Sequence, residues 1–376
     1  MLGNFWFKKE KPFLGLTGLG GGVGSNLVAG GDDKVYVEGV FNTDLWEGNA
    51  TSRSITNDID LNGEGGMVWI RNRDAIEYHS ITDTAQTYDT TYNAYHRGHS
   101  NASYGYSIHT AGGISSFNSD GFSLNTDNAE WNASSNNYVS WTFRKAPGFF
   151  DIQTWNGDSG GINNDRLQLS HDLGCKVGFA IIKCTSHNST NWLVWHKHDG
   201  LTQNYLTLNS GDGYKNGNYI FYGGQSSGYA INSSTQFGNI GPYDHGNETG
   251  KTYVAYLFAD GDESDAQIFG AGGDEAIIKC GSYTGNGSST GPTITLGFEP
   301  QWLMIKTTDT DAYDWAILDT TRDAGMGEML VANTDAAETA TTHVNLTSTG
   351  FDITSQGYIV NKSGDEYIYV AIRKPD

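Results

Sequence analysis

One short stretch that recurs three times constrains the fold more than any other feature of the sequence. In residues 137–145, polar side chains alternate with Val139, Trp141 and Phe143, which is the period-two pattern of a strand with one buried face. Similar stretches follow at residues 252–260 and 366–374, and the matching tyrosines are Tyr138, Tyr253 and Tyr367. These tyrosines are spaced by 115 residues (253 − 138) and by 114 residues (367 − 253). A period of this length indicates repeated small domains rather than the shorter units of a solenoid.

Three further landmarks recur in the same order in each copy. The first is a turn in which an aromatic residue shortly precedes a glycine, at Trp46, Trp155 and Tyr283. The second runs from a leucine through an apolar segment to a basic residue, at residues 61–71, 173–183 and 296–306. The third is an aromatic strand, at residues 77–81, 191–195 and 314–318. The continuous apolar segment of the second landmark indicates a central strand that is buried on both faces.

These landmarks predict an all-β protein with three tandem β-sandwich or jelly-roll-like domains of about 110 residues each. We expect the domains at residues 37–147, 148–262 and 263–376, after an extended N-terminal arm at residues 1–36. Apolar residues nowhere keep a period of 3.6 over three turns, so helices should be few and short. Glycine is abundant, with 50 residues, and aromatics make up 12% of the chain, which suits short strands joined by tight turns.

The charge of the chain disfavours nucleic acid as a partner. Lysine and arginine total 22 against 43 acidic residues, a net charge of −21, which repels phosphate backbones. No apolar run approaches the ~18 residues of a membrane helix, and lysines directly follow the short apolar patch near the N-terminus, so we expect neither a membrane span nor a signal peptide. The cysteines Cys175, Cys184 and Cys280 lack paired spacing, which predicts buried free thiols and synthesis in a reducing cytoplasm.

The N-terminal arm joins an aromatic and basic head to a glycine-rich tether. The aromatic and basic residues of the head are Phe5, Trp6, Phe7, Lys8, Lys9 and Lys11. Such a segment cannot build its own core, so it is either a frayed terminus or a docking peptide that orders on a partner. We favour docking, because adjacent aromatics beside lysines are unusual in a tail without a partner. The glycine run lacks the Lys-Ser/Thr pair of a phosphate-binding loop.

Residues 157–161, Gly-Asp-Ser-Gly-Gly, match the nucleophile motif of chymotrypsin-like proteases. We interpret them as a turn, because the motif coincides with the first landmark and its serine does not recur. The position of Ser159 is taken by Ala50 and Gly287 in the other copies, and Ile162 replaces the proline that normally follows. Because the segment recurs without its serine, a structural turn explains it better than a nucleophile does.

Histidine and acidic clusters offer candidate metal ligands. Two histidine pairs are close in sequence, His196 with His198 on an expected strand and His96 with His99 in a loop. Neither pair has further ligands at a telling spacing, so hydrogen-bonded or solvated imidazoles are favoured. Alternating carboxylates of the kind that Ca²⁺ prefers occur at Asp260, Asp262 and Asp265, and again at Asp309, Asp311 and Asp314. Both clusters lack the glycine and the terminal glutamate of an EF-hand loop, so solvated surface carboxylates are the alternative to Ca²⁺ sites.

A loop of the first copy contains tyrosines that do not recur, namely Tyr88, Tyr92, Tyr95, Tyr104 and Tyr106. With Asn and Ser between them, they resemble an adaptable binding surface. We take Tyr92, Tyr95, Tyr104 and Tyr106 as candidate ligand-binding residues. The aromatics of the first landmark do recur, which fits a structural anchor better than a specific site.

Several segments carry a family resemblance. They are the aromatic and basic head with its glycine-rich tether, and residues 66–73, 117–122, 141–151 and 252–259. Together they resemble tail-fibre-like virion proteins of marine cyanobacterial phages. The resemblance spans most of the chain and implies a structural or adhesive role in the virion, with no catalytic residues and no cofactor. It also implies that the arm docks to other virion proteins and that the loops contact a host surface glycan or other subunits.

Homotrimerisation is the usual route of assembly for such fibres and is expected here by analogy alone. The third copy departs most from the pattern, which favours a stalk, adaptor or decoration role over a receptor-binding tip. Two other functions stay open. A glycan-active hydrolase on a β-sandwich scaffold would need two carboxylates at catalytic separation, and the sequence singles out no such pair. A purely structural collar or decoration protein would neither cleave nor bind glycan.

Overall fold

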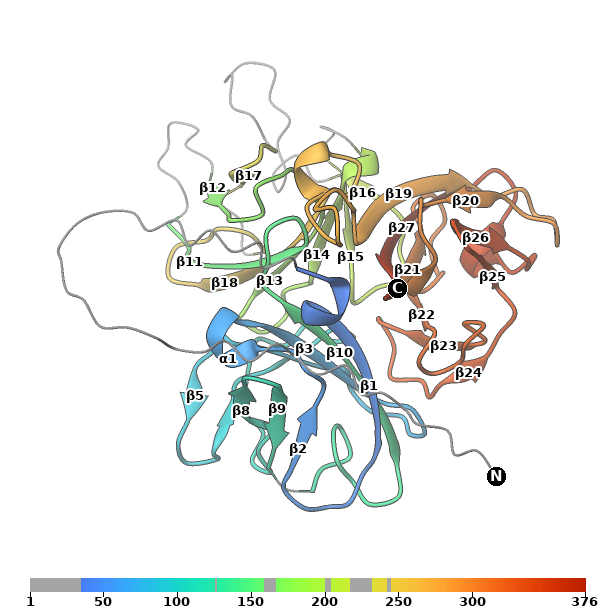
Figure 1. Ribbon diagram of the computed structural model, residues 1–376. Helices are drawn as coiled ribbons and strands as arrows, with labels where there is room; N and C mark the ends of the chain where they lie inside the picture. The colour runs from blue at the N-terminus through green and yellow to red at the C-terminus, as the bar shows by residue number, and fades with distance from the viewer. Residues whose placement is uncertain (1–34, 126, 159–166, 200–203, 217–231, 242–244) are drawn as a thin grey trace, which may run out of the picture. The chain divides into compact units, whose positions relative to one another are not determined.

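The computed structural model of the chain describes residues 35–376, apart from residue 126 and the ranges 159–166, 200–203, 217–231 and 242–244 (Figure 1). The candidate docking residues Phe5, Trp6, Phe7, Lys8, Lys9 and Lys11 therefore lie outside the described residues. Residues Lys34–Asp376 form one compact unit. The described secondary structure is almost entirely antiparallel β-sheet, which confirms the all-β fold class. Its helices are single turns: η1 (Val37–Gly39), α1 (Leu61–Glu64), η2 (Lys197–Asp199), η3 (Ser264–Ala266) and α2 (Tyr358–Asn361).

Each expected segment contains one large sheet with the same strand order. In repeat 1 (residues 37–147) the order is β1 (Phe41–Glu47), β10 (Asn137–Arg144), β3 (Gly66–Asn72), β4 (Ser80–Asp83) and β7 (Gly98–His99). In repeat 2 (residues 148–262) it is β11 (Phe150–Asn156), β18 (Thr252–Ala259), β13 (Val177–Cys184), β14 (Leu193–His196), β15 (Asn204–Thr207) and β16 (Lys215–Asn216). In repeat 3 (residues 263–376) it is β19 (Ile278–Thr284), β27 (Glu366–Arg373), β21 (Pro300–Thr307), β22 (Ala316–Asp319), β23 (Glu328–Val331) and β24 (Thr339–Ala340).

A small sheet accompanies each large one, and in Figure 1 it lies on the outer side of its repeat. The small sheets are β2 (Arg53–Thr56), β9 (Gly121–Leu124) and β8 (Ile114–Asn118); β12 (Leu167–Ser170) and β17 (Gln236–Ile240); and β20 (Thr293–Thr295), β26 (Gly350–Ile353) and β25 (Val344–Thr347). Repeat 1 also has a hairpin of β5 (Tyr88–Asp89) and β6 (Ala94–Tyr95). The diverged second copy keeps the same buried aromatic, because Phe237 pairs with Leu169 as Phe122 does with Ile55.

The closing strands predicted from the repeat, β10, β18 and β27, have the same register in all three sheets. Trp141 lies opposite Trp69, Tyr256 opposite Ile181 and Val370 opposite Met304. The central strands β3, β13 and β21 are buried along their whole length, as the continuous apolar segment predicts.

The aromatics of the first landmark are structural anchors, as expected from their recurrence. Each stacks on the leading tyrosine of the closing strand, with ring centroids 5.6 Å apart for Trp46 and Tyr138, 5.2 Å for Trp155 and Tyr253, and 5.1 Å for Tyr283 and Tyr367. The turn glycine that follows leaves room for the backbone, since a Cβ on Gly157 would lie 2.0 Å from the Glu248 carbonyl oxygen. Only glycine fits such a close approach.

One hydrophobic core is shared by the three large sheets. It contains the inward face of every closing strand: Val139, Trp141, Phe143, Val254, Tyr256, Phe258, Ile368, Val370 and Ile372. The ring of Phe143 lies 5.6 Å from that of Phe258 and 5.9 Å from that of Trp302, so aromatic side chains of all three repeats meet. Separate apolar clusters fill repeats 1 and 3 between their large and small sheets. Burial of the shared face is the main force that holds the repeats together.

Candidate functional site

Three basic side chains are buried at matching positions of the central strands. Arg71, Lys183 and Lys306 are 0% exposed and lie opposite Val139, Val254 and Ile368, respectively. Each donates a hydrogen bond to a backbone carbonyl of another repeat: Arg71 to Asp335 (2.7 Å), Lys183 to Ser103 (3.3 Å) and Lys306 to Gly211 (3.1 Å). Repeat 1 thus reaches repeat 3, repeat 3 reaches repeat 2, and repeat 2 reaches repeat 1. These contacts close a ring with pseudo-three-fold symmetry, which we call the repeat ring.

Backbone hydrogen bonds follow the same cyclic order. The three carbonyls that accept from the basic side chains also accept backbone N–H groups, from Glu77 to Asp335 (3.2 Å), from Thr190 to Ser103 (3.1 Å) and from Tyr313 to Gly211 (3.2 Å). A second set joins Tyr106 to Thr185 (2.7 Å), Tyr214 to Thr308 (2.7 Å) and Glu338 to Arg73 (2.8 Å). Because these donors and acceptors belong to the backbone, the three repeats make the same hydrogen bonds although their side chains at these positions differ.

The aromatic residue of the third landmark completes the ring. The indole N–H of Trp192 donates to the His99 carbonyl (2.8 Å), and that of Trp315 donates to the Thr207 carbonyl (3.0 Å). His79 takes this position in repeat 1 and interacts with the Val331 backbone. Its Nδ1 accepts from Trp69 (2.9 Å), so the neutral ring carries its proton on Nε2. Burial lowers the pKa of His79 well below its ordinary value and keeps it neutral.

Removing charged groups from water lowers the pKa of the three buried bases. Burial lowers the pKa of Lys183 and of Lys306 to about 8, and that of Arg71 to about 10. Hydrogen bonds to carbonyl oxygens offset part of the cost of burial. A lysine with a lowered pKa can serve as a nucleophile, but the Lys183 amine is buried and donates to the Thr190 carbonyl and hydroxyl (2.5 and 2.9 Å). Its place in the structure suits holding the ring together.

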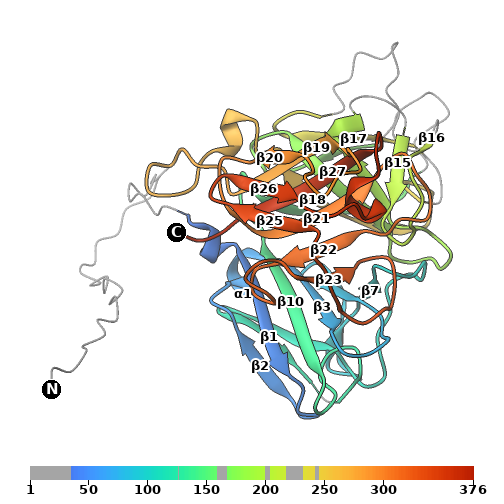
Figure 2. The ribbon, with the colours of Figure 1, turned by 90° about the vertical axis from the view of Figure 1, so that its right-hand side faces the viewer.

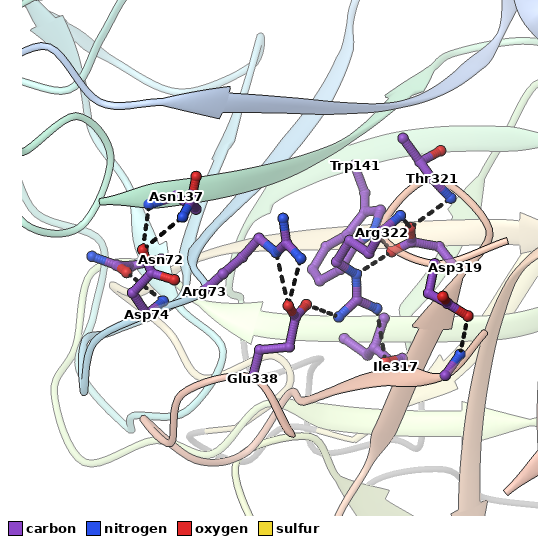
Figure 3. A network of polar contacts seen from close by, with 12 residues as sticks. Asn72, Arg73, Asp74, Asn137, Trp141, Ile317, Asp319, Thr321, Arg322 and Glu338 are labelled. Atoms are coloured by element: carbon purple, nitrogen blue, oxygen red, sulfur yellow. Dashed lines mark hydrogen bonds and ion pairs between the residues drawn. The ribbon is translucent and has the colours of Figure 1, made fainter. Parts of the chain in front are cut away.

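The interface between repeats 1 and 3 adds a network of charges (Figure 3). Glu338 accepts from Arg73 (2.6 Å) and from Arg322 (2.9 Å). Arg322 also pairs with Asp319 (2.5 Å), and its guanidinium lies 5.5 Å from the ring centroid of Trp141. Figure 2 shows β22 and β23 of repeat 3 directly above β10 and β3 of repeat 1. Repeats 1 and 3 are not consecutive in the chain, so side chains and backbone contacts alone join them.

A polar pocket of about 510 Å³ opens where the three repeats meet. We call it the axial pocket, and its lining residues are Tyr78, Asn101, Ala102, Ser103, Tyr104, Asn209, Asn333, Thr334 and Asp335. One asparagine comes from each repeat at an equivalent position, because Asn101, Asn209 and Asn333 accept the backbone N–H groups of His79, Trp192 and Trp315 (3.1, 2.9 and 2.9 Å). A pocket lined by equivalent residues of three repeats lies on the pseudo-three-fold axis.

The four candidate tyrosines do not form one surface. Tyr104 is exposed and lines the axial pocket. Tyr106 instead packs against the shared core, and its hydroxyl hydrogen-bonds that of Tyr256 (2.6 Å). Tyr95 packs on Phe117 in repeat 1 (4.7 Å between ring centroids), and Tyr92 is half-buried. The expectation of a shared loop surface was wrong for Tyr106, since the repeat ring draws it into the interior.

Lysines neutralise the acidic cluster at the second repeat boundary. Asp260 and Asp262 both accept from the amine of Lys197 (2.5 and 2.6 Å), and Asp262 also pairs with Lys279 (3.1 Å). Asp265 is exposed and lies next to the Ser264 hydroxyl (3.5 Å). Asp260 and Asp262 face lysines and Asp265 points to a hydroxyl, so the three carboxylates do not converge as Ca²⁺ ligands. Throughout the described ranges, no three His, Cys, Asp or Glu side chains are grouped so as to hold a metal ion.

The second acidic cluster is also divided among separate partners. Asp309 accepts the backbone N–H of Glu366 (2.8 Å), Asp311 that of Gly213 (2.9 Å), and Asp314 accepts from the Asn333 amide (2.6 Å). Each carboxylate therefore fixes a loop rather than facing its neighbours.

The histidine pairs do not form metal sites. The expectation that His196 and His198 share a strand face was wrong, because β14 ends at His196 and His198 lies in η2. His196 is buried against the Tyr369 carbonyl (3.2 Å), and burial lowers its pKa to about 3. His99 contacts Glu130 (3.2 Å). His96, which precedes it in the same loop, is half-buried. Burial raises the pKa of Glu130, but hydrogen bonds from His99 and Arg97 outweigh it and bring the pKa to about 2.

The remaining predictions concern the protease-like motif and the cysteines. Ser159 lies outside the described residues, but Asp158 is bonded to the Asn247 amide (2.8 Å) just as Asn49 is to Asn132 (3.0 Å). The motif therefore begins as the same turn in two repeats.

The three cysteines are free and buried, which confirms the prediction for the thiols of Cys175, Cys184 and Cys280.

Sequence reasoning missed the three asparagines of the axial pocket. They lie 30, 26 and 27 residues after Arg71, Lys183 and Lys306 (101 − 71, 209 − 183, 333 − 306), so loops of different length hide their equivalence. The available signal is that each follows the end of a short strand by two residues and precedes a small residue.

Comparisons with known proteins place the whole repeat region in one family. None of the helices in the described part of the chain has the length and apolar character needed to cross a membrane. A search of curated proteins gives no match. Residues 38–375 match the family described as Domain of unknown function (DUF7483), a span that contains all three large sheets. The chain therefore belongs to the DUF7483 family.

Proposed function

We propose that the chain is a structural protein of a phage virion, a tail fibre or related appendage, docked by its N-terminal arm to another virion protein. The observation that supports this role best is the repeat ring. The resemblance to tail-fibre-like proteins implies a homotrimer, and the ring gives a single chain the pseudo-three-fold arrangement that a homotrimer would have.

The recurring side chains of the first two landmarks are committed to the scaffold. Arg71, Lys183 and Lys306 bind backbone carbonyls, and the aromatics of the first landmark stack within their own sheets. A frame built in this way suits a structural part of a particle. Contacts with other virion subunits or with the host surface then fall to residues that do not recur.

The ring also suggests how the chain assembles. We propose that three repeats of one chain take the places of three chains, so the protein acts as a monomer. Light scattering on the purified full chain should give a mass near that of one chain, 40.8 kDa. A stable assembly of three chains at micromolar concentration would contradict this assignment.

Deletion of residues 1–20 tests the docking role of the arm. The deleted chain should keep the thermal unfolding of the full chain, because residues Lys34–Asp376 form a compact unit by themselves. In infected cells that supply either form, purified particles should contain the full chain and lack the deleted one. Equal incorporation of both forms would contradict docking by the arm, and absence of the full chain from particles would contradict the virion role.

A further inference from the structure

We propose that the axial pocket binds a neutral saccharide unit. This inference does not rest on the virion role, since the pocket belongs to the compact repeat unit and can be tested on the purified chain. Its volume of about 510 Å³ falls within the range of small-ligand sites, roughly 300–1,000 Å³. The lining combines side-chain amides, hydroxyls, one carboxylate and two tyrosines, which are the groups that hydroxyl-rich ligands require.

The amides of the pocket are held in place before any ligand arrives. Asn209 and Asn333 each accept a backbone N–H and donate one amide hydrogen, to Asn191 (2.9 Å) and to Asp314 (2.6 Å), respectively. An asparagine amide has two hydrogens, so each keeps a second donor. Asn101 is fixed through its oxygen by the His79 N–H (3.1 Å). Fixed donors around one space lower the entropy cost of binding.

Two aromatic rings supply an apolar surface at the mouth of the pocket. Tyr78 is 38% exposed and Tyr104 is 52% exposed, so part of each ring is accessible to a ligand. Tyr78 stacks on His99, with ring centroids 4.8 Å apart, so its orientation is supported from behind. Tyrosine presents an apolar face and a hydroxyl together, which matches a sugar ring with C–H groups on its face and hydroxyls at its edge.

The charges around the pocket favour a ligand without net charge. Arg71 and Lys183 donate to the backbone carbonyls of two lining residues, Asp335 and Ser103, and Lys306 donates to that of Gly211, which lies outside the lining. Asp335 lines the pocket, and its carboxylate interacts with the guanidinium of Arg71. The carboxylate therefore weakens the attraction of an anion, and the buried cations weaken that of a cation. Hydrogen bonding to neutral hydroxyls is the interaction that remains.

Saturation-transfer NMR on the full chain tests the proposal directly. The neutral probes are the methyl glycosides of glucose, galactose, mannose and N-acetylglucosamine, and the charged probes are choline and glucuronate. We expect transfer to at least one neutral glycoside. Tyr104→Ala should weaken that binding about tenfold, the loss expected for one truncated aromatic contact.

Tyr358→Ala is the matched control, because Tyr358 is 54% exposed and lies outside the pocket, and it should leave the affinity unchanged. Asp335→Asn keeps a hydrogen-bonding group of the same size and should change the affinity for a neutral glycoside less than Tyr104→Ala does. Absence of transfer to every neutral glycoside would overturn the proposal. So would binding that Tyr104→Ala leaves intact, or stronger transfer to choline or glucuronate than to any neutral probe.

Discussion

The indole N–H of Trp141 donates to the carboxylate of Asp319 across the interface between repeats 1 and 3, at 3.0 Å. Tyr256, at the same position in repeat 2, donates to Asp83 of repeat 1 (2.6 Å). In repeat 3 the position is Val370, which cannot donate, and His196 of repeat 2 contacts the neighbouring Tyr369 carbonyl instead (3.2 Å). The closing strand therefore joins each repeat to the next around the ring.

Substitution Trp141→Phe should lower the free energy of unfolding by about 1–3 kcal/mol, because it leaves the buried Asp319 carboxylate with one donor fewer. Trp155→Phe is the control, since it also removes an indole donor (to the Gly246 carbonyl, 3.1 Å) but at a partly exposed position. Urea unfolding should show the larger loss for Trp141→Phe. Equal losses would mean that the contact across the interface adds nothing to the packing of the ring.

The charge network of that interface should be worth more than ordinary surface ion pairs. Glu338→Gln removes the charged partner of Arg73 and leaves the buried Arg322 with Asp319 as its remaining carboxylate. Because two charge-assisted hydrogen bonds at a buried position are weakened, we expect a loss of about 1.5–3 kcal/mol in urea unfolding. The control Glu299→Gln breaks a pair with Lys374 whose partners are 35% and 49% exposed, and it should cost under about 1 kcal/mol. A Glu338→Gln variant as stable as the control would show that the network is not needed for ring closure.

Much of the fold follows from the repeat, and the rest depends on contacts between distant residues. The alternation in residues 137–145 correctly assigns Val139, Trp141 and Phe143 to a core. Nothing in the alternation indicates that the same core serves three sheets, because that depends on which surfaces meet in space. A basic residue at the end of an apolar strand looks like an exposed charge, and only the neighbouring repeat supplies the carbonyl that allows Arg71 to be buried.

The candidate sites divide in the same way, into those that the repeat predicts and those that depend on contacts between distant residues. The prediction that the recurring aromatics are anchors rested on recurrence and is confirmed. The preference for hydrogen-bonded imidazoles holds for His196, and only the shared strand face was wrong, because β14 ends at His196 and His198 lies in η2. The axial pocket was missed because insertions obscure the equivalence of its asparagines.

A shared core predicts cooperative unfolding. Three independent domains would unfold in separate steps, whereas repeats that share one core should lose it together. Tryptophan fluorescence and far-ultraviolet circular dichroism should therefore give one coincident transition in urea. Two or more separated transitions, or a stable fragment of residues 37–147 alone, would contradict the shared core.

The buried cysteines should be inert in the folded protein. Burial raises the pKa of Cys175 to about 12 and that of Cys280 still further, and reaction requires an accessible thiolate. A thiol reagent at pH 8 should label none of the three cysteines in the native chain and all three in urea. Rapid labelling of any of them without denaturant would place that thiol at the surface.

The buried lysines should make stability rise with pH. The pKa of Lys183 and of Lys306 is about 8 in the folded protein against an ordinary value of 10.5. Between these values the unfolded chain holds protons that the folded chain has released, so the free energy of unfolding increases with pH in this window. The buried tyrosines act in the opposite sense, since burial raises the pKa of Tyr256 well above 10.0, and their effect begins only near that value.

Urea unfolding between pH 8 and pH 10 should show the rise in the free energy of unfolding. Lys183→Met should reduce the slope of this rise with pH, whereas the exposed control Lys374→Met should not. A slope that Lys183→Met leaves unchanged would mean that Lys183 keeps its proton in the folded chain, held by the carbonyls of Ser103 and Thr190.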